Sequence, residues 1–357
     1  MKKRISKLQA ELKEKELDAL LINTPENRRY MTGFTGTAGT VLVSQEEAIL
    51  ITDFRYTQQA KKQAPDYRVV EFKGSKLDKI NELLKGLKID TLGFEATYEN
   101  YNTYLNYKEK LDVSLKATEN IVKKIRMIKN SDEIEKIKKA VEITDDAFTM
   151  IREFLRIGVI ERDVALELEF FMKKAGATDN AFDFIVASGE RSALPHGVAS
   201  DKKITAGDFV TMDFGCVYDG YHSDMTRTVV VGEEATTKQK EIYEIVLKAQ
   251  LEAIKGIKAG IKGSEVDKIA RDIIAQAGYE DYFGHGLGHC VGLEIHEGPR
   301  LSPKDDTVLE AGMVVTVEPG IYLPNWGGVR IEDIVVVTED GCEILTESSK
   351  ELLIIDN

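Results

Sequence analysis

Acidic residues inside strand-like runs are the feature of this chain that most restricts its fold. Asp213 lies in DFVTMDFGCVY, Glu318 directly follows MVVTV, and Glu332 lies in GGVRIEDIVVV. Asp and Glu are depleted from strands, which are rich in β-branched and aromatic residues. A carboxylate buried there without compensation would take up a proton because its pKa would rise strongly. Several such acids converging on one place therefore predict a metal site.

The acids form two pairs. Asp213 and Asp224 are 11 residues apart, on either side of a turn predicted at Asp219-Gly220, so they should lie on neighbouring strands of a hairpin. Glu318 and Glu332 are 14 residues apart, across the turn-rich segment IYLPNWGG. Cross-strand neighbours have Cβ atoms about 4.5–5.5 Å apart, which lets two carboxylates share an ion. We therefore predict two hairpins that each contribute two metal ligands.

His289 is the predicted fifth ligand. It lies in FGHGLGHCVGLEIHEGPR, which holds three of the 5 histidines and several glycines that let the backbone approach a ligand. Four carboxylates balance the charge of two divalent cations, so we expect two metal ions. Oxygen-rich ligation with one imidazole favours Mn²⁺, Co²⁺ or Fe²⁺ over Zn²⁺. Among these four ions we expect Mn²⁺. Two such ions about 3.5–4 Å apart activate water and polarise a carbonyl, which indicates hydrolysis.

The size and charge of the chain limit its organisation and partners. At 357 residues it exceeds the usual size of a single core, so two domains are expected, residues 1–125 and 126–357, joined at a basic connector. A net charge of −13 argues against nucleic acid and anionic membrane surfaces as partners. The sequence has no run of about 18 apolar residues that would predict a membrane span. Its 3 cysteines lack disulfide-framework spacing, so we expect a cytoplasmic protein.

The order of predicted elements differs between the two domains. Residues 1–125 alternate helices with strands at DALLINT, TVLVS and AILIT, which indicates an α/β domain. Residues 126–357 are predicted to begin with helices over about 132–156 and 161–176 and to continue in strands. Two further helices, about 238–256 and 264–278, precede a final strand-rich part. Gly33, Gly36 and Gly39 imitate a phosphate-binding loop, but no Lys-Ser/Thr pair follows, so we interpret them as turn and packing residues.

Six motifs of the second domain resemble the Xaa-Pro branch of the pita-bread metallopeptidases, which comprises prolidase and Xaa-Pro aminopeptidase. They are LPHG, MDFG, SDMTRT, HGLGHCVGLEIHE, VEPGIY and GVRIED. The segments YMTGFTGTAG and ITDFRY resemble the creatinase-type N-terminal domain, so the resemblance covers nearly the full chain. It implies an α/β N-terminal domain, an α+β pita-bread catalytic domain and hydrolysis of the peptide bond before proline.

The resemblance also assigns roles to the five ligands. It implies that Asp213 binds one ion, that Asp224 and Glu332 bridge both ions, and that His289 and Glu318 complete the second site. A metal-bridging hydroxide would attack the carbonyl before proline. Glu318 would serve as its proton shuttle.

Further residues are implied in substrate handling. By resemblance, His196 contacts substrate near the leaving proline, and His296 stabilises the oxyanion or positions the scissile carbonyl. His285, four residues before His289, is typical of the Xaa-Pro branch and not of methionine aminopeptidases. Arg330, two residues before Glu332, matches the same branch and could order the carboxylates through its planar fork.

Three residues of the catalytic domain remain open to two interpretations. Arg300 matches an arginine that holds the substrate's C-terminal carboxylate in prolidase-like members, or it is a surface charge after a turn. Tyr322 either donates its hydroxyl to the site or is a packed tyrosine. Cys290 stands where the family usually has glycine, and it is either a tolerated small residue or a modifier of metal preference.

Three functions follow from this resemblance. The first is a dipeptidase whose substrate is a small peptide with proline at the second position, and the second is an aminopeptidase on longer peptides. The third, a catalytically silent binding protein, is disfavoured because all five ligands are intact. Family members are often homodimers in which the N-terminal domain reaches over a neighbour's active site, so a homodimer is expected. The N-terminal residues that would contribute are Phe34, Asp53 and Arg55.

Overall fold

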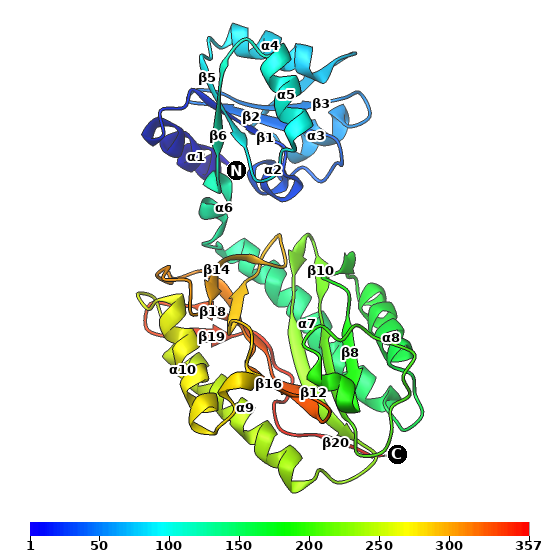
Figure 1. Cartoon of the computed structure of the whole chain (residues 1–357). Helices are drawn as coiled ribbons and strands as arrows, with labels where there is room; N and C mark the ends of the chain where they lie inside the picture. The colour runs from blue at the N-terminus through cyan, green and yellow to red at the C-terminus, as the bar shows by residue number, and fades with distance from the viewer. Residues whose placement is uncertain (357) are drawn as a thin grey trace. The chain divides into compact units, whose positions relative to one another are not determined.

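The strand-like segments of residues 1–125 assemble into one mixed sheet. In the computed structural model, which describes residues 1–356, the chain divides into two units, Met1–Arg126 and a second that begins at Met127 (Figure 1). The sheet of the first unit has the strand order β4-β3-β2-β1-β5-β6. The central strand β1 pairs antiparallel with β2 and parallel with β5. The α/β class predicted for this region is confirmed.

Amphipathic helices cover this sheet. The helices of the first unit are α1 (Lys2–Glu14), α2 (Pro25–Thr32), α3 (Thr57–Gln63), α4 (Lys76–Gly86), α5 (Tyr101–Lys110) and α6 (Ile121–Arg126). Its strands are β1 (Ala19–Ile22), β2 (Thr40–Ser44), β3 (Ala48–Thr52), β4 (Arg68–Glu71), β5 (Thr91–Glu95) and β6 (Ser114–Thr118). Strand β1 reads ALLI and is buried at every position, as expected for a strand covered on both faces.

The glycines that imitate a phosphate loop have packing and turn roles. Gly33 ends α2 in the left-handed conformation, with φ of 75°, which glycine adopts without steric cost. At Gly36, an added Cβ would lie 2.2 Å from Cζ of Phe34, so the buried Phe34 ring requires glycine there. The interpretation of these glycines as turn and packing residues is confirmed.

The second unit packs two pairs of helices against strands (Figure 1). Its helices are α7 (Ser131–Phe154), α8 (Glu161–Lys174), α9 (Thr237–Gly256) and α10 (Gly263–Gln276), with short 3-10 turns at Gly189–Ala193 and Glu280–Tyr282. The first strands are β7 (Asp179–Asn180), β8 (Ile185–Ser188), β9 (Phe209–Phe214), β10 (Cys216–Tyr218), β11 (Tyr221–His222) and β12 (Met225–Val231). The later strands are β13 (Gly288–Cys290), β14 (Glu297–Leu301), β15 (Val314–Val317), β16 (Gly320–Leu323), β17 (Gly327–Arg330), β18 (Asp333–Val337), β19 (Cys342–Ile344) and β20 (Ile354–Ile355).

Each helix pair has its own core. Helices α7 and α8 bury their apolar faces with residues of β8, β9 and β12, whereas α9 and α10 bury theirs with residues of β13 to β18. The start of α7 shows how local sequence sets an element. The Asn130 side chain accepts a hydrogen bond from the backbone amide of Glu133 while the Glu133 carboxylate accepts one from the backbone amide of Asn130, which forms a capping box.

The first acidic hairpin differs from its predicted form. Asp219 and Gly220 both have positive φ, which confirms the tight turn. However, the strands on either side are interrupted, so β9 and β12 pair in one sheet while β10 and β11 belong to another. The interruption includes Gly215, where an added Cβ would lie 2.0 Å from the carbonyl oxygen of Ser223. Asp213 and Asp224 therefore stand at a point where the hairpin passes from one sheet to another.

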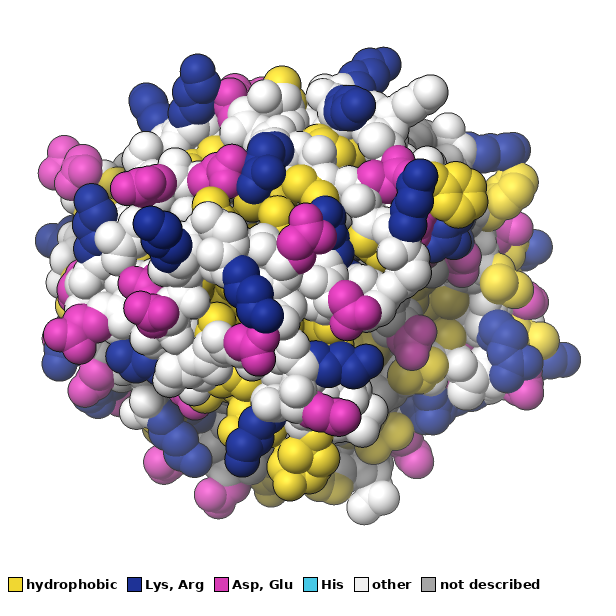
Figure 2. Space-filling view, turned by 90° about the horizontal axis from the view of Figure 1, so that it is seen from above, with side chains coloured by type: hydrophobic (Ala, Val, Ile, Leu, Met, Phe, Trp, Pro, Cys, Tyr) yellow, Lys and Arg dark blue, Asp and Glu magenta, His cyan; other side chains and the backbone are white. Residues whose placement is uncertain are grey.

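The described surface shows no strong segregation of charge on the face in Figure 2, where Lys and Arg side chains are interspersed with Asp and Glu. Among the helices of residues 1–356, none is long and apolar enough to cross a membrane.

Candidate metal centre and substrate cavity

The two acidic pairs occupy equivalent places in two hairpins. Asp213 is opposite Thr226 in the β9/β12 ladder, and Asp224 immediately precedes β12. In the second hairpin the β15/β18 ladder ends with Val317 opposite Asp333. Glu318 and Glu332 follow directly on this pair, before β16 and β17 form a separate two-stranded sheet. Both pairs thus lie where regular pairing stops, which frees their side chains to converge.

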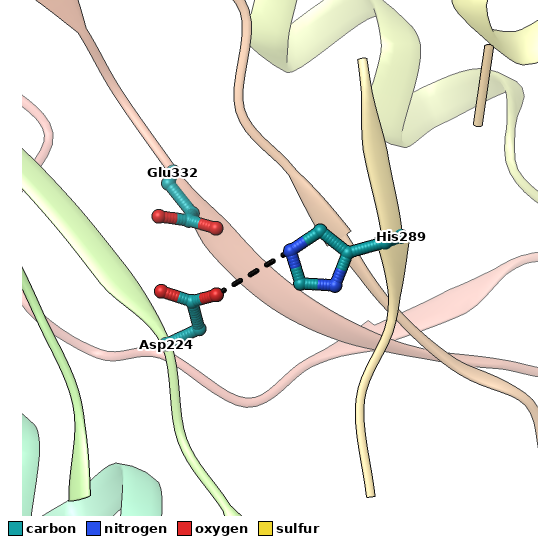
Figure 3. Close-up of side chains that lie close together, drawn as sticks. All are labelled: Asp224, His289 and Glu332. Carbon is teal, nitrogen blue, oxygen red and sulfur yellow. Dashed lines mark ion pairs between the residues drawn. The ribbon is translucent and has the colours of Figure 1, made fainter. Parts of the chain in front are cut away.

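Three of the predicted ligands already lie within reach of one ion. Potential ligand atoms of Asp224, His289 and Glu332 are all within 4.8 Å of one another. Figure 3 shows the carboxylates of Asp224 and Glu332 facing each other, with the His289 ring directed at them from β13. The Nε2 atom of His289 lies 3.5 Å from Oδ2 of Asp224 and also 3.5 Å from Oε1 of Glu318. The structure therefore gathers residues that are more than 100 positions apart in the chain.

The surroundings of His289 keep its imidazole neutral, which is the form that binds metal ions. Its Nδ1 lies 3.1 Å from the carbonyl oxygen of Cys290, and a carbonyl can only accept a hydrogen bond. Nδ1 therefore carries the proton, and Nε2 presents its lone pair to Asp224 and Glu318. Burial, and then the neighbouring His296, lower the pKa of His289 to about 4. An imidazole that resists protonation is available to a metal at neutral pH.

The carboxyl groups are destabilised as anions in the metal-free chain. Burial raises the pKa of Glu318 to about 8, and Asp213 adds to this rise. Burial also raises the pKa of Asp224 and of Glu332 well above the ordinary range, with further rises from the neighbouring carboxylates. These three groups can all be ionised at neutral pH only where positive charge compensates them.

Unpaired oxygens provide a separate test of whether the residues fit a metal. Oδ1 of Asp213 and Oε1 of Glu332 are buried and have no hydrogen-bond partner among residues 1–356. Buried acceptors without a partner are rare because each loses its interaction with water. Two such oxygens beside a neutral imidazole form the oxygen-rich donor set that divalent cations prefer. Divalent metal ions therefore fit these residues.

Arg330 connects this acidic centre with its surroundings. Its guanidinium donates from Nη2 to Oδ2 of Asp213 at 2.6 Å, and from Nε to Oγ1 of Thr226 at 3.0 Å. The Thr226 hydroxyl in turn donates to Oε2 of Glu332 at 2.8 Å. One buried arginine thus orients a carboxylate from each hairpin.

A second branch of the network leads to His285. Nη1 of Arg330 donates to the hydroxyl of Tyr322 at 2.8 Å, and this hydroxyl lies 2.9 Å from Nε2 of His285. Nδ1 of His285 lies 2.8 Å from the carbonyl oxygen of Gly286, so Nδ1 is the protonated nitrogen and Nε2 accepts from Tyr322. Burial, followed by the charge of Arg330, lowers the pKa of His285 to about 4. His285 is therefore a neutral acceptor.

The other predicted residues line a cavity of about 870 Å³ that opens over the acidic centre. His196 and His296 are exposed on its wall, and the ring of His296 packs edge-on against His289 with centroids 4.5 Å apart. Arg300 and Lys304 contribute positive charge to the lining. The apolar part of the lining includes Phe182, Ile185, Val198, Phe283 and Ile295.

The predicted residues outside this lining have other surroundings. Tyr322 is not among the residues that line the cavity, but its hydroxyl hydrogen-bonds to two that are, His285 and Arg330. Cys290, the last residue of β13, is fully buried in the α9/α10 core, where burial raises the pKa of its thiol to about 12. Within the first unit, Phe34 is buried and packs against Tyr56, while Asp53 forms an ion pair with Arg55 at 2.8 Å.

Several polar residues that position the centre were not singled out from the sequence. Thr226 is one, and Thr316 is another, because its hydroxyl accepts from the His289 amide at 3.0 Å and donates to Glu318 at 3.3 Å. Arg271 donates to the carbonyl oxygen of His285 at 2.8 Å and pairs with the buried Asp267. The apolar face of α10 that carries Asp267 was a usable signal, since an acid there requires a partner.

Known proteins share both the sequence and this structure. Residues 135–339 match the model of metallopeptidase family M24, and residues 4–128 match the creatinase/prolidase N-terminal domain. The chain belongs to metallopeptidase family M24. The expected fold class, an α/β N-terminal domain with an α+β pita-bread catalytic domain, is thereby confirmed, as is the expectation of a peptidase.

Relatives in this family align over nearly their full length. A Xaa-Pro dipeptidase of Pyrococcus furiosus is 48% identical over 355 residues, which cover 99% of this chain and 100% of that protein. The solved structure of a Xaa-Pro dipeptidase from Bacillus anthracis is 52% identical, with a TM-score of 0.97 and 99% of each chain covered. An X-Pro aminopeptidase structure from Thermotoga maritima is 43% identical, with a TM-score of 0.91, covering 95% of this chain and 98% of that one.

Proposed function

We propose that this M24 peptidase hydrolyses Xaa-Pro bonds with two divalent metal ions, and that Xaa-Pro dipeptides are its preferred substrates. The main support for this proposal is the buried acidic centre. There, one carboxylate oxygen of Asp213 and one of Glu332 have no hydrogen-bond partner in the part of the chain that the structure describes. The similarity to proteins named Xaa-Pro dipeptidase supports the proline specificity. The proposed ion is Mn²⁺. A homodimer and a cytoplasmic location also stay predictions.

The ions would be held by five side chains, namely those of Asp213, Asp224, His289, Glu318 and Glu332. When bound, they supply Lewis-acid polarisation of a carbonyl and lower the pKa of water. Glu318 is the proposed proton shuttle because its carboxylate lines the cavity and its Oε1 lies 3.5 Å from Nε2 of His289, beside the proposed ions. Thr316 orients this carboxylate through its hydroxyl.

The cavity walls supply the remaining groups. His296, next to His289, is placed to donate a hydrogen bond to the oxyanion that develops at the scissile carbonyl. His196 is proposed to contact substrate near the leaving proline. Arg330 and Tyr322 act behind His285 and keep it oriented toward the cavity. The apolar lining matches the hydrophobic character of a proline ring.

Preference for dipeptides rests on the positive charge in the lining. Arg300 and Lys304 both border the cavity, and either can pair with a free carboxylate at the end of a short substrate. An aminopeptidase acting on longer peptides is the second candidate. The cavity volume of about 870 Å³ favours it, because this space exceeds what a dipeptide fills.

Comparison of Ala-Pro, Ala-Pro-amide and Ala-Pro-Ala as substrates separates the two candidates. A dipeptidase should show its highest kcat/KM on Ala-Pro, and replacement of Arg300 by Gln should lower this value while sparing the amide. Equal or higher kcat/KM on Ala-Pro-Ala would establish the aminopeptidase instead.

Metal dependence is tested with the same substrates. Chelator-treated protein should be inactive, and Mn²⁺ or Co²⁺ should restore cleavage. Asp224→Asn should remain folded but lose bound metal and turnover. Full activity in excess chelator would show that catalysis does not depend on a metal ion. A folded, metal-free protein that cleaves none of the three peptides after reloading with either ion would contradict the proposed function.

A further inference from the structure

A buried carboxylate outside the metal centre joins the two ends of the loop that carries His196. Glu161, the first residue of α8, is fully buried. Its Oε1 accepts hydrogen bonds from the amide and the hydroxyl of Ser188, each at 2.8 Å. Its Oε2 accepts from the amide of Ser200 at 3.1 Å and from the hydroxyl of the same residue. These two serines flank residues 189–199, so one side chain closes the loop at its base.

The closed loop forms part of the substrate cavity. Pro195, His196 and Val198 all line it. Inside the loop, Arg191 donates from Nε to Oε2 of Glu161 at 3.0 Å and from Nη2 to the carbonyl oxygen of Val198 at 2.7 Å. Glu161 therefore also holds the guanidinium of Arg191, which hydrogen-bonds to the cavity-lining residue Val198.

Few apolar contacts are available to hold this loop. Leu194 and Val198 are 50% and 53% exposed, so the loop has little hydrophobic burial of its own. Besides Glu161, several polar groups anchor it to the rest of the unit, and Ala199 adds an apolar contact with the core. The amide of Gly328 donates to the Ser192 hydroxyl at 2.8 Å, and Nη1 of Arg330 donates to the Pro195 carbonyl at 3.2 Å. A loop held largely by hydrogen bonds depends on them for its position.

We propose that Glu161 is a positioning residue for the peptidase reaction: by closing the loop of residues 189–199, it sets the place of His196 in the cavity. The inference rests on the proposed function insofar as His196 contacts substrate. Glu161 itself touches neither substrate nor metal, since it is shielded from the cavity. Its position at the N-terminus of α8 favours the negative charge that it needs to accept these bonds.

Glu161→Gln is the decisive variant because it preserves size while placing one NH₂ group in the cluster. Each carboxylate oxygen faces a backbone N–H, from Ser188 or from Ser200, and a backbone N–H cannot reverse its role as the serine hydroxyls can. One end of the loop must therefore lose its backbone hydrogen bond to residue 161. In the metal-loaded full chain, we expect faster amide hydrogen exchange confined to residues 188–200. We also expect about a tenfold lower kcat/KM on Ala-Pro, because small misplacements of a substrate contact are costly.

Coupling to His196 distinguishes positioning from a general effect. In a His196→Ala background, Glu161→Gln should lower kcat/KM less than twofold, since the group that it positions is already gone. Leu168→Ala is the matched control, because Leu168 lies in the buried core on the same helix and its apolar side chain offers the loop no hydrogen bond. It should speed exchange across the unit and leave kcat/KM within twofold of wild type.

Three results would overturn the proposal. The first is unchanged amide hydrogen exchange at residues 188–200 in Glu161→Gln. The second is a double variant in which Glu161→Gln and His196→Ala lower kcat/KM by independent factors. The third is a loss of bound metal from Glu161→Gln in proportion to its loss of activity. If Glu161→Gln does not fold, Ser200→Ala removes one of the donors and should show the same local exchange and coupling with smaller amplitude. If the wild type cleaves no Xaa-Pro peptide, the proposed function fails, while the exchange measurement still decides whether Glu161 holds the loop.

Discussion

The guanidinium of Arg330 lies 2.6 Å from Oδ2 of Asp213, and only 3% of the Arg330 side chain is exposed. A buried cation that is not itself a metal ligand thus fixes one oxygen of a proposed metal ligand and leaves the other oxygen, Oδ1, without a hydrogen-bond partner. This division of roles explains how a strand can present a carboxylate with a defined orientation. The same guanidinium reaches Thr226 and Tyr322, so the metal centre and the substrate cavity share one support.

Arg330→Lys tests whether this geometry matters beyond charge. A lysine ammonium keeps the positive charge but cannot meet Asp213, Thr226 and Tyr322 through a planar fork. We expect a fall in kcat/KM on the order of 100-fold, as for other small misplacements in active sites, with bound metal largely retained. Steady-state kinetics with elemental analysis measure both. Arg162→Lys, a substitution in an exposed ion pair, is the control and should leave both unchanged. Wild-type kinetics in Arg330→Lys would show that charge alone suffices.

Tyr322→Phe removes only the hydroxyl between Arg330 and His285. Arg330 is buried and His285 is half-buried, so the loss leaves Nε2 of His285 without its donor and should cost about 1–3 kcal/mol of unfolding free energy. We also expect lower kcat/KM with unchanged metal content, since Tyr322 is not a metal ligand. Urea denaturation and kinetics of the metal-loaded protein check the two effects. If Tyr322 is only a packed ring, as one interpretation of the sequence holds, neither quantity will change.

The gathering of acids into one centre could be predicted from sequence because its signal is local. An acid such as Glu332 stands out inside IEDIVVV without any knowledge of its partners. Hairpin spacing then brings Asp213 near Asp224 and Glu318 near Glu332, and the structure has both relationships. The predicted first hairpin and its turn are present, but the spacing did not reveal that its strands divide between two sheets, where Gly215 closely approaches Ser223. This approach depends on tertiary packing that no alternation of residues reveals.

The supporting residues could not be predicted because their partners are remote. Thr226 is an ordinary strand residue by pattern, yet its hydroxyl serves Glu332, which is 106 positions away. Glu161 appears in the sequence as a charged residue near the start of a helix, where solvent exposure is the normal expectation. Only the fold shows that it is fully buried beneath the loop of His196. Long-range hydrogen bonds leave no periodic trace in a single sequence.

Arg227→Met should strongly destabilise the catalytic unit. Arg227 and Asp333 form an ion pair at 2.8 Å, with exposed fractions of 1% and 0% for their side chains. Removing one partner of a buried pair typically costs about 3–5 kcal/mol. Lys350 also pairs with Asp333 but is 20% exposed, so Lys350→Met should cost less and serves as the comparison. Urea denaturation of both variants measures which substitution lowers the free energy of unfolding more. Equal losses would mean that burial of Arg227 does not determine its contribution.

The metal-free protein should lose stability as the pH rises from about 6.5 to about 8. Glu318 has an ordinary pKa of 4.5 and a folded pKa of about 8, so across this window the folded state binds more protons than the unfolded state. Stability then falls with increasing pH. His285 and His289, with folded pKa values of about 4, produce the opposite slope only below about 6.5. Urea denaturation in chelator should show that the free energy of unfolding falls by about 1–2 kcal/mol over this pH window. In Glu318→Gln this fall should be smaller. Equal or greater stability at pH 8 would contradict the charge burial on which the metal centre is argued.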